Sequence, residues 1–557
     1  MTTPDQQAAQ DRQIAAIQQA VNHRLKTPTT SAAAVLDDAV RTNPLLAAAL
    51  ASRLQRQGNN AAAELIYLAA QPYWRREDGL ALYNNLAVIA SQAHDFDLAW
   101  AWTRHAMAVN PKAAALMAYD LARTAIFSAR HDIYWAATKA AYDLEPDNIR
   151  YWSSLYVEDS FRRMPGRQDP DRPVPPPPVR PPAARPARPM AESPKRILLV
   201  GRDFSNVASF NRMYGPFRHL PDCGFQVECL SVRNDFDPDR AHLPEFSYHS
   251  APERDAPALA AALHRLAPDV IIDLVSHGQP EAFNAYAERP AALILGWAGN
   301  GVSSGTQVYD AFLTDAAISP PGAEHHYTER LVRLPASSMT LEPYPSYPEP
   351  EDTRLPLERN GHVTFGAYHR ISKVTEEVVA LWSDLLRAVP GSRLVIKTGF
   401  VTQPAQSRWL QAIFDRHGIP AERLSLMPMT EPPDHCRIVA ATDLTLTPFP
   451  EQGFVTDFDH LWMGVPFVAY EVDARPCARL AASLAKAAGA PFLVTRSPAA
   501  YIQTARDLVA DPGYLRTART AYRQNLIDAG MTDHRRTARA MAEAINTLWA
   551  ERRDGRS

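Results

Sequence analysis

Two patterns of apolar positions divide this sequence of 557 residues. Up to about residue 160 the chain is rich in alanine, and its apolar residues recur with the period of an α-helix. From Lys195 onward, short apolar runs alternate with amphipathic helical segments, which predicts parallel sheets. The expected strands of a first sheet are Ile197–Gly201, Phe225–Val232, Val270–Leu274 and Leu293–Trp297. After a Pro-rich crossing, Pro335–Pro356, the expected strands of a second are Val363–Ala367, Leu394–Lys397, Leu424–Met427, Leu444–Thr447 and Phe467–Tyr470.

The helical region contains an internal repeat. Five residues recur at a spacing of 35 positions: Asp97, Trp100, Thr103, Ala106 and Pro111 reappear as Asp132, Trp135, Thr138, Ala141 and Pro146. A period of about 34, with small residues inside the helices and Pro at each repeat end, is typical of tetratricopeptide repeats. A degenerate earlier copy lies around Ala61 to Pro72. The alternative is a generic Ala-rich bundle, and the five matched positions favour the repeat.

A proline-rich and arginine-rich segment follows the helical region. Residues 164–194 contain twelve prolines, including Pro175 to Pro178. Such a segment favours extended polyproline II, so its ~30 residues could separate two domains by roughly 90 Å. Its arginines could contact an acidic partner, but a solvated linker is the favoured interpretation.

Composition narrows the class of protein. A formal net charge of -3 gives no general attraction to nucleic acid or anionic membranes. The polar start and the lack of any apolar run of about 18 residues lead us to expect a soluble cytoplasmic protein with no membrane span. Four scattered cysteines are too few for a disulfide framework or a structural zinc site, so we expect free thiols.

The segment Thr447 to Pro466 carries the strongest chemical signal. It is predicted to be a strand end, a loop containing Gly453, a helix with an acid in its first turns, and a Gly-Val-Pro turn into the next strand. This order places backbone amides and a carboxylate at the carboxyl edge of a parallel sheet. Nucleotides and nucleotide sugars bind at such edges, so the chain is predicted to be an enzyme.

This segment resembles the donor site of glycosyltransferase family 41, which contains the O-GlcNAc transferases, SPINDLY and the adhesin N-glucosyltransferases. The matching positions are Pro448, Asp459, Leu461, Trp462, Gly464 and Pro466. The Pro-Phe-Pro triplet from Pro448 is closer to the N-glucosyltransferase branch. Phe454, Val455 and Thr456 replace the His-Thr-Thr of the O-GlcNAc transferases. The resemblance covers about residues 195 to 545.

The resemblance implies roles for residues on the donor side. Lys373, which follows the strand-end pair Phe365 and Gly366, matches the family's lysine that neutralises the departing diphosphate. Asp459 matches the carboxylate that binds the nucleoside ribose, and Thr456 would contact phosphate. Two further matches are Arg479, which could assist at the phosphates, and Met427, at the place where the family's backbone binds the base. For each, an ordinary structural role is the alternative.

The resemblance also marks residues in the first sheet. In APDVIIDLVSHGQ, His277 matches a family histidine at the end of a strand, where it could relay a proton or position the acceptor. The loop from Trp297 to Gly305 departs from the family pattern. The front loop GRDFSNVASFNRMYG lacks the family's histidine and offers Ser205, Asn206 and Asn211 as polar candidates.

Together these features predict a GT-B glycosyltransferase behind a helical repeat domain. We expect a repeat domain at 1–160, a linker at 161–194, an acceptor-side Rossmann-like domain at 195–350 and a nucleotide-sugar-binding domain at 351–557. The expected reaction is inverting transfer of a sugar, most simply from a UDP-linked donor, to a Ser/Thr or Asn side chain of a protein chosen by the repeats, such as a bacterial surface or flagellar protein. His277 and Lys373 are the expected catalytic residues, and no metal or cofactor beyond the nucleotide sugar is expected. The alternatives are a catalytically inactive GT-B scaffold and a glycosyltransferase acting on a non-protein acceptor.

Overall fold

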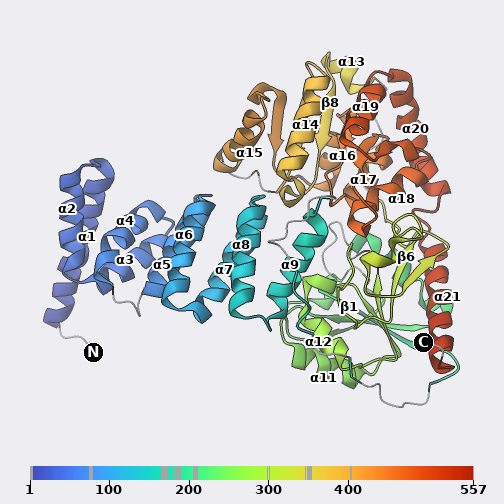
Figure 1. Cartoon of the computed structure of the whole chain (residues 1–557), viewed down its shortest axis with the longest axis horizontal. Coiled ribbons are helices and arrows are strands. Elements are labelled where there is room, and N and C mark those ends of the chain that lie inside the picture. The colour runs from blue at the N-terminus through green and yellow to red at the C-terminus, as the bar shows by residue number, and fades with distance from the viewer. Residues whose placement is uncertain are drawn as a thin grey trace. The chain divides into compact units, whose positions relative to one another are not determined.

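The computed structural model of the chain describes residues 4–74, 79–164, 174–179, 182–183, 190–202, 204, 211–241, 243–297, 299, 301–344, 347, 354–399, 401 and 404–555. Contacts within the chain divide it into two compact units, Met1–Asp147 and Asn148–Ser557. The first unit is helical and the second contains both sheets (Figure 1). In the described part of the chain, no helix has both the length and the apolar content needed to cross a membrane.

The N-terminal unit is built from antiparallel helix pairs. Its helices are α1 (Pro4–Lys26), α2 (Thr30–Arg41), α3 (Pro44–Arg56), α4 (Asn60–Ala70), α5 (Gly79–Gln92), α6 (Phe96–Val109), α7 (Pro111–Ile126) and α8 (His131–Leu144). The turn inside three successive pairs uses one left-handed residue at the equivalent place: Gly58, His94 and Ala129. In each case the N-cap of the second helix follows directly. This recurrence confirms the helical repeat region.

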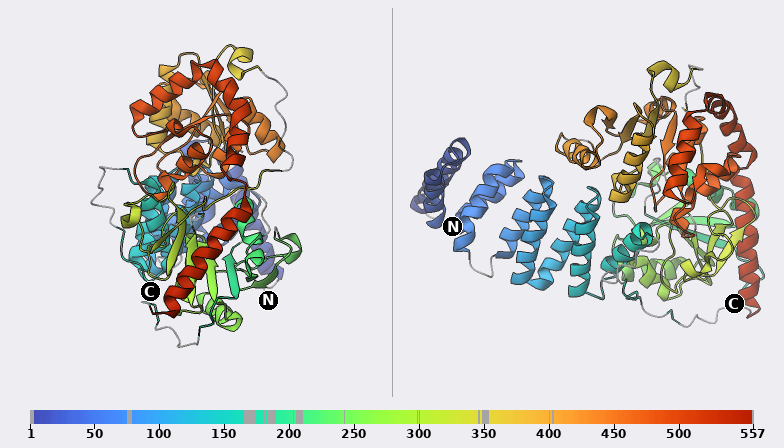
Figure 2. Two further views of the ribbon diagram at one scale, coloured as in Figure 1. Left: turned by 90° about the vertical axis from the view of Figure 1, so that its right-hand side faces the viewer. Right: turned by 45° about the horizontal axis from the view of Figure 1, so that its top comes forward.

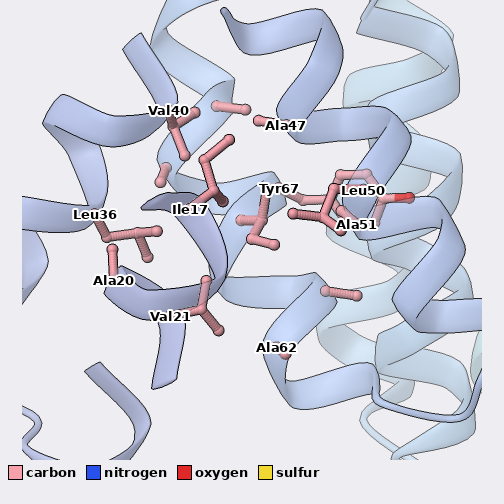
Figure 3. Packing of buried hydrophobic residues seen from close by; sticks show 14 of the residues in the cluster. Ile17, Ala20, Val21, Leu36, Val40, Ala47, Leu50, Ala51, Ala62 and Tyr67 are labelled. Atoms are coloured by element: carbon pink, nitrogen blue, oxygen red, sulfur yellow. The ribbon is translucent and has the colours of Figure 1, made fainter. Parts of the chain in front are cut away.

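Small residues let these helices approach closely. Figure 3 shows the cluster in which Ile17, Leu36, Val40, Leu50 and Tyr67 meet beside several alanines. The repeated Thr103 and Thr138 are fully buried, as are Ala106 and Ala141 one turn later. The side chain of Thr103 donates to the carbonyl of Ala99 (2.9 Å), so its hydroxyl is satisfied inside the helix. The repeated Thr and Ala positions are therefore packing positions.

The C-terminal unit begins with α9 (Ile149–Arg162) and then forms a seven-stranded parallel sheet. The strands are β1 (Arg196–Gly201), β2 (Gln226–Ser231), β3 (Ser247–Ser250), β4 (Val270–Asp273), β5 (Leu293–Trp297), β6 (Ala311–Asp315) and β7 (Leu331–Leu334). Their spatial order is β3-β2-β1-β4-β5-β6-β7, so the order reverses between β1 and β4. The helices of this domain include α10 (Gly215–Arg218), α11 (Ala256–Leu266) and α12 (Glu281–Ala287).

The second sheet repeats this winding. It contains β8 (Thr364–Ala367), β9 (Arg393–Lys397), β10 (Leu424–Met427), β11 (Leu444–Leu446), β12 (Phe467–Tyr470) and β13 (Val494–Thr495), in the order β10-β9-β8-β11-β12-β13. Its helices are α13 (Pro356–Asn360), α14 (Glu376–Ala388), α15 (Pro404–Arg416), α16 (Pro432–Ala440), α17 (Val455–Trp462), α18 (Leu480–Ala487), α19 (Pro498–Val509) and α20 (Pro512–Asp528). A helical region followed along the chain by two parallel, Rossmann-like sheets confirms the expected fold class.

Two segments connect the sheets. The described residues of the Pro-rich crossing, 335–344, 347 and 354–355, form neither helix nor strand. The last helix, α21 (His534–Arg553), returns to the first sheet, where it contacts β7 and α10 (Figure 2). In the expected linker, residues 174–179, 182–183 and 190–194 also lack helix and strand, and its other residues beyond 164 lie outside the described ones. The domain boundaries expected from the sequence stay a prediction.

Candidate functional site

The carboxyl ends of β8 and β11 lie side by side in the second sheet. These strands pair in parallel, with Phe365 opposite Leu444 and Gly366 opposite Thr445. The strand order reverses between them, and in open α/β sheets this is the crevice where ligands bind. The segment after β8 leads to η8 (Ile371–Lys373), and the one after β11 leads through the 451–454 loop to α17. Both expected phosphate-binding segments therefore lie at one edge.

Lys373 is directed at the 451–454 loop. Its ammonium donates to the carbonyl of Gln452 (2.7 Å) and lies 3.4 Å from Oε1 of Glu451. Burial lowers the pKa of Lys373, and the neighbouring Glu451 opposes that change. The structure thus brings the predicted lysine to the predicted loop.

Glu451 is surrounded by cations. Arg370 and Lys373 face its Oε1, at 2.8 and 3.4 Å, and Arg162 of α9 lies 2.8 Å from its Oε2. Burial raises the pKa of the Glu451 carboxyl, but Lys373, Arg162 and Arg370 outweigh burial and hold that pKa well below its ordinary range. The carboxylate is therefore charged near neutral pH. Glu158 also lies 3.9 Å from Arg162, so three cations and two carboxylates leave a local excess of positive charge, which favours an anionic ligand.

The N-terminus of α17 faces the same loop. The helix begins at Val455 without a side-chain cap, and Thr456 lies half-buried in its first turn. The first amides of a helix have no partner inside it and attract anions. Gly453 is needed just before this helix, because a Cβ there would lie 2.6 Å from His369 and 2.9 Å from Asp457.

Asp459, the predicted ribose ligand, is buried against the first domain. Arg212, of η2 (Asn211–Met213), donates to Oδ1 at 2.8 Å and to Oδ2 at 3.2 Å. Tyr347 donates a further hydrogen bond to Oδ1. The guanidinium of Arg212 also stacks on Tyr344, 3.9 Å from the ring centre, and donates to the carbonyl of Glu342 (2.8 Å). A ribose could use both oxygens of Asp459 only if these donors moved.

A second acid on α17 lies beneath the loop. Asp457 is fully buried, accepts a hydrogen bond from Thr447 (3.1 Å), and lies 3.3 Å from Nε2 of His369 and 3.5 Å from Nδ1 of His460. Burial raises the pKa of Asp457 to about 7, and lowers the pKa of both histidines well below the ordinary value. Burial thus favours the uncharged forms of all three groups, unlike the ionised Glu451 beside them.

His277 lies on the other sheet, after β4, in η5 (Ser276–Gly278). Its Nε2 lies 3.0 Å from the carbonyl of Ser303, to which only a protonated nitrogen can donate. Its Nδ1 lies 2.7 Å from Oγ of Ser153 on α9. Burial lowers the pKa of His277 to about 4. The ring is neutral near pH 7 with both nitrogens engaged, and a role in catalysis stays a prediction.

Arg479 and Met427, the two remaining predicted residues, form hydrogen bonds or ion pairs with other residues of the chain. Arg479 pairs with Glu471 and donates to the carbonyl of Ala317 in the first domain (3.1 Å). Met427 ends the edge strand β10, and its carbonyl accepts from the amide of Thr398 (3.0 Å). Both residues lie in the domain that contains Lys373, but among the described residues no hydrogen bond or ion pair joins either of them to Lys373.

Several residues of the site were not predicted. Glu451 stands inside the recognised motif, and an acid in a loop expected to bind phosphate is a signal that could have been used. Arg212 directly follows Asn211, which the sequence offered as a polar candidate in the front loop. Ser205 and Asn206 lie outside the described residues, and so does the side chain of Asn211. Nothing in the local sequence indicates that Arg162 reaches the site, because it falls in the expected linker, whereas the structure places it at the end of α9.

Comparisons with known proteins agree with this geometry. Residues 353–541 match the model of the family described as Glycosyl transferase family 41. The chain is 30% identical over 291 residues to the probable UDP-N-acetylglucosamine--peptide N-acetylglucosaminyltransferase SPINDLY of Solanum lycopersicum, covering 52% of this chain and 31% of the relative. It is 23% identical over 370 residues to the probable enzyme SEC of Arabidopsis thaliana, covering 64% of this chain and 37% of the relative. The chain thus spans about a third of the length of these curated relatives.

A solved structure resembles this chain over its whole length. It is a mutant O-GlcNAc transferase of Thermobaculum terrenum, with a TM-score of 0.73, 24% identity and full coverage of both chains. At this identity the likeness shows the fold, a helical region followed by a GT-B pair of Rossmann-like domains.

Proposed function

Because this chain is a member of glycosyltransferase family 41 with N-terminal helical repeats, we propose that it transfers a sugar from a nucleotide-sugar donor to a side chain of a protein. A UDP-linked donor is the simplest choice, since the names of the curated relatives specify UDP-N-acetylglucosamine. Ser/Thr and Asn side chains are both retained as acceptors. We keep the cytoplasmic location expected from the sequence as part of this proposal.

The excess of positive charge around Glu451 is the observation that carries the proposal. Lys373, Arg370 and Arg162 face one carboxylate at the edge of the sheet where the strand order reverses. The uncapped first turn of α17 adds partial positive charge at the same edge. A diphosphate carries the complementary negative charge. It has several oxygens, so it can bind several hydrogen-bond donors at once.

The chemistry follows from this charge. The acceptor oxygen or nitrogen attacks the anomeric carbon and loses its proton to solvent, the bond from that carbon to the diphosphate oxygen breaks, and the electron pair leaves with the diphosphate. Negative charge therefore develops on the leaving group in the transition state. Lys373 and the amides of α17 would stabilise this charge without rearranging, which is the usual origin of large electrostatic rate effects. Asp459 would then contact the ribose once Arg212 and Tyr347 give way.

A binding panel tests the proposal. Calorimetry of the full chain with a series of nucleotide sugars, followed by an assay of sugar transfer to protein, separates the possibilities. We expect one donor to bind and to be turned over. If none of the donors binds, the proposal fails.

The repeat region is proposed to choose the protein acceptor. A chain that begins at Asn148 keeps α9 and all of the second compact unit. It should bind and slowly hydrolyse the donor but transfer little sugar to the native acceptor. Equal transfer by the truncated and full chains would remove acceptor selection from the repeats.

An inactive scaffold is the second candidate, and the state of Asp459 favours it. Both oxygens of this carboxylate already accept hydrogen bonds from the protein. In a scaffold that pairing would be permanent, and the buried Arg212 would simply join the two domains. A folded chain that binds neither nucleoside diphosphates nor nucleotide sugars would support this second function.

A further inference from the structure

Helix α9 is anchored to both Rossmann-like domains. Near its start, Arg150 forms an ion pair with Glu281 of the first domain, and Ser153 contacts His277. At its end, Arg475 of the second domain donates to the carbonyls of Ser160 (2.7 Å) and Arg163. A cation at the open carbonyls of a helix end is favourable. The last turn of α9 is therefore held in a fixed place beside the 451–454 loop.

Arg162 points from this last turn into the Lys373 site. Its side chain is 13% exposed, lies 2.8 Å from Oε2 of Glu451 and lies 3.9 Å from Glu158 on its own helix. The next residue, Arg163, is 54% exposed and pairs with Asp159 instead. The two adjacent arginines thus have separate partners, which makes Arg163 a matched control.

Glu451 divides its two oxygens between different cations. Oε2 faces Arg162, and Oε1 faces Lys373 and Arg370. Without Arg162, Oε2 would be a buried charge with no cation, and the carboxylate would gain energy by turning both oxygens toward Lys373. A lysine paired in that way has less positive charge to offer a ligand.

We propose that Arg162 is a positioning residue, which holds one oxygen of Glu451 and so keeps the ammonium of Lys373 available to the diphosphate of the donor. The proposal rests on the proposed function, in which Lys373 contacts that diphosphate. Arg162 acts through Glu451 and touches neither donor nor acceptor. Helix α9, which carries Arg162, follows the repeats in the sequence. Through Arg162 it contacts Glu451 of the donor site.

The kinetic test compares full-length Arg162→Met with Arg163→Met. We expect Arg162→Met to lower kcat for donor turnover by about tenfold or more, the scale of lost supporting contacts around a reactive group, with the acceptor KM unchanged. Arg162→Lys keeps a cation and should recover part of the loss. Arg163→Met should stay within about twofold of the wild type. Equal kcat values for the wild type and a folded Arg162→Met protein would overturn the proposal.

A second measurement needs no turnover. Brief acetylation with acetic anhydride across a pH series, read by peptide mass spectrometry, gives the pH at which Lys373 becomes reactive. Removing Arg162 takes away a nearby positive charge and frees Glu451, and both changes raise the pKa of Lys373. The midpoint should therefore move to higher pH in Arg162→Met and stay fixed in Arg163→Met. An unchanged midpoint in Arg162→Met contradicts the proposal.

The two readouts separate this proposal from the proposed function. If the wild type turns over no donor, the proposed function fails, while the labelling midpoint still decides whether Arg162 controls Lys373. Should Arg162→Met not fold, Glu451→Gln replaces it. Loss of the carboxylate removes the charge that favours the ammonium, so its midpoint should move to lower pH. A midpoint that does not fall in Glu451→Gln would also overturn the proposal.

Discussion

The two sheets have the same strand order at their reversal points, but the side chains there differ in charge. Beside β4, Asp273 accepts hydrogen bonds from the amides of Val275 and Ser276 and from the hydroxyl of Tyr309, and burial raises its pKa. His277 nearby is neutral. Beside β8 and β11, Glu451 is ionised among three cations. The fold supplies the same crevice twice, and the side chains decide which one attracts an anion.

The largest expected effect is on the free energy of unfolding, and it comes from the ion pair of Arg212 with Asp459, which joins the two Rossmann-like domains. Asp459→Asn leaves Arg212 as a buried cation without its carboxylate, since the two side chains are 3% and 5% exposed. We expect a loss of about 3 to 5 kcal/mol in the free energy of unfolding, measured by denaturant titration. The exposed Asp434→Asn is the control. Replacing both partners, with Arg212→Met and Asp459→Leu, should recover most of the loss. A stable Asp459→Asn protein would show that the two domains do not depend on this pair.

The second effect concerns Asp457, which should make the free energy of unfolding depend on pH. Its folded pKa, raised by burial to about 7, exceeds the ordinary 3.8, so folding favours the protonated form. The stabilisation from this group is complete below the ordinary value and is lost as the pH rises through about 7. Between pH 4 and 7, the wild type should lose about 1.4 kcal/mol per pH unit relative to Asp457→Asn. Parallel stability curves for the two proteins would contradict a protonated Asp457.

The smallest effect is on donor binding, and it compares the exposed Arg370 with the buried Lys373. Arg370 faces the same oxygen of Glu451 as Lys373 does, but its side chain is 64% exposed. Solvent screens such a charge, so Arg370→Ala should weaken donor binding by about 1 kcal/mol or less in calorimetry. A loss as large as that caused by Lys373→Ala would mean that the burial of the lysine is not what distinguishes it.

The sequence predicted the sheets better than the contacts between distant segments. Strands such as β5 and β12 have the bounds expected from their continuous apolar runs, and β10 also has its expected bounds. Three strands of the first sheet, β3, β6 and β7, were not among the expected ones. The four residues of β3, Ser247–Ser250, are only partly buried and show no apolar run. The two residues of β13 are too few to give a pattern.

The candidate site was predictable where its parts are close in sequence. The order of strand, loop and helix from Thr447 places Thr456 and Asp459 on one helix, and the segment after β8 places Lys373 beside it. The partners Arg162 and Arg212 come from distant segments, and no local period shows which cation will face a given carboxylate. The same limit explains why the pairing of Asp459 with Arg212 was not foreseen.

Binding of UDP and of uridine to the wild type and to Lys373→Ala tests the central claim most directly, with the exposed Lys486→Ala as the control. The account predicts that Lys373→Ala weakens UDP binding by about 1.5 to 3 kcal/mol, the usual value of a hydrogen bond to a charged group. Binding of uridine, which lacks the diphosphate, should not change. Equal affinity of the wild type and folded Lys373→Ala for UDP would contradict the assignment of this lysine, and of the charged crevice around it, to the diphosphate.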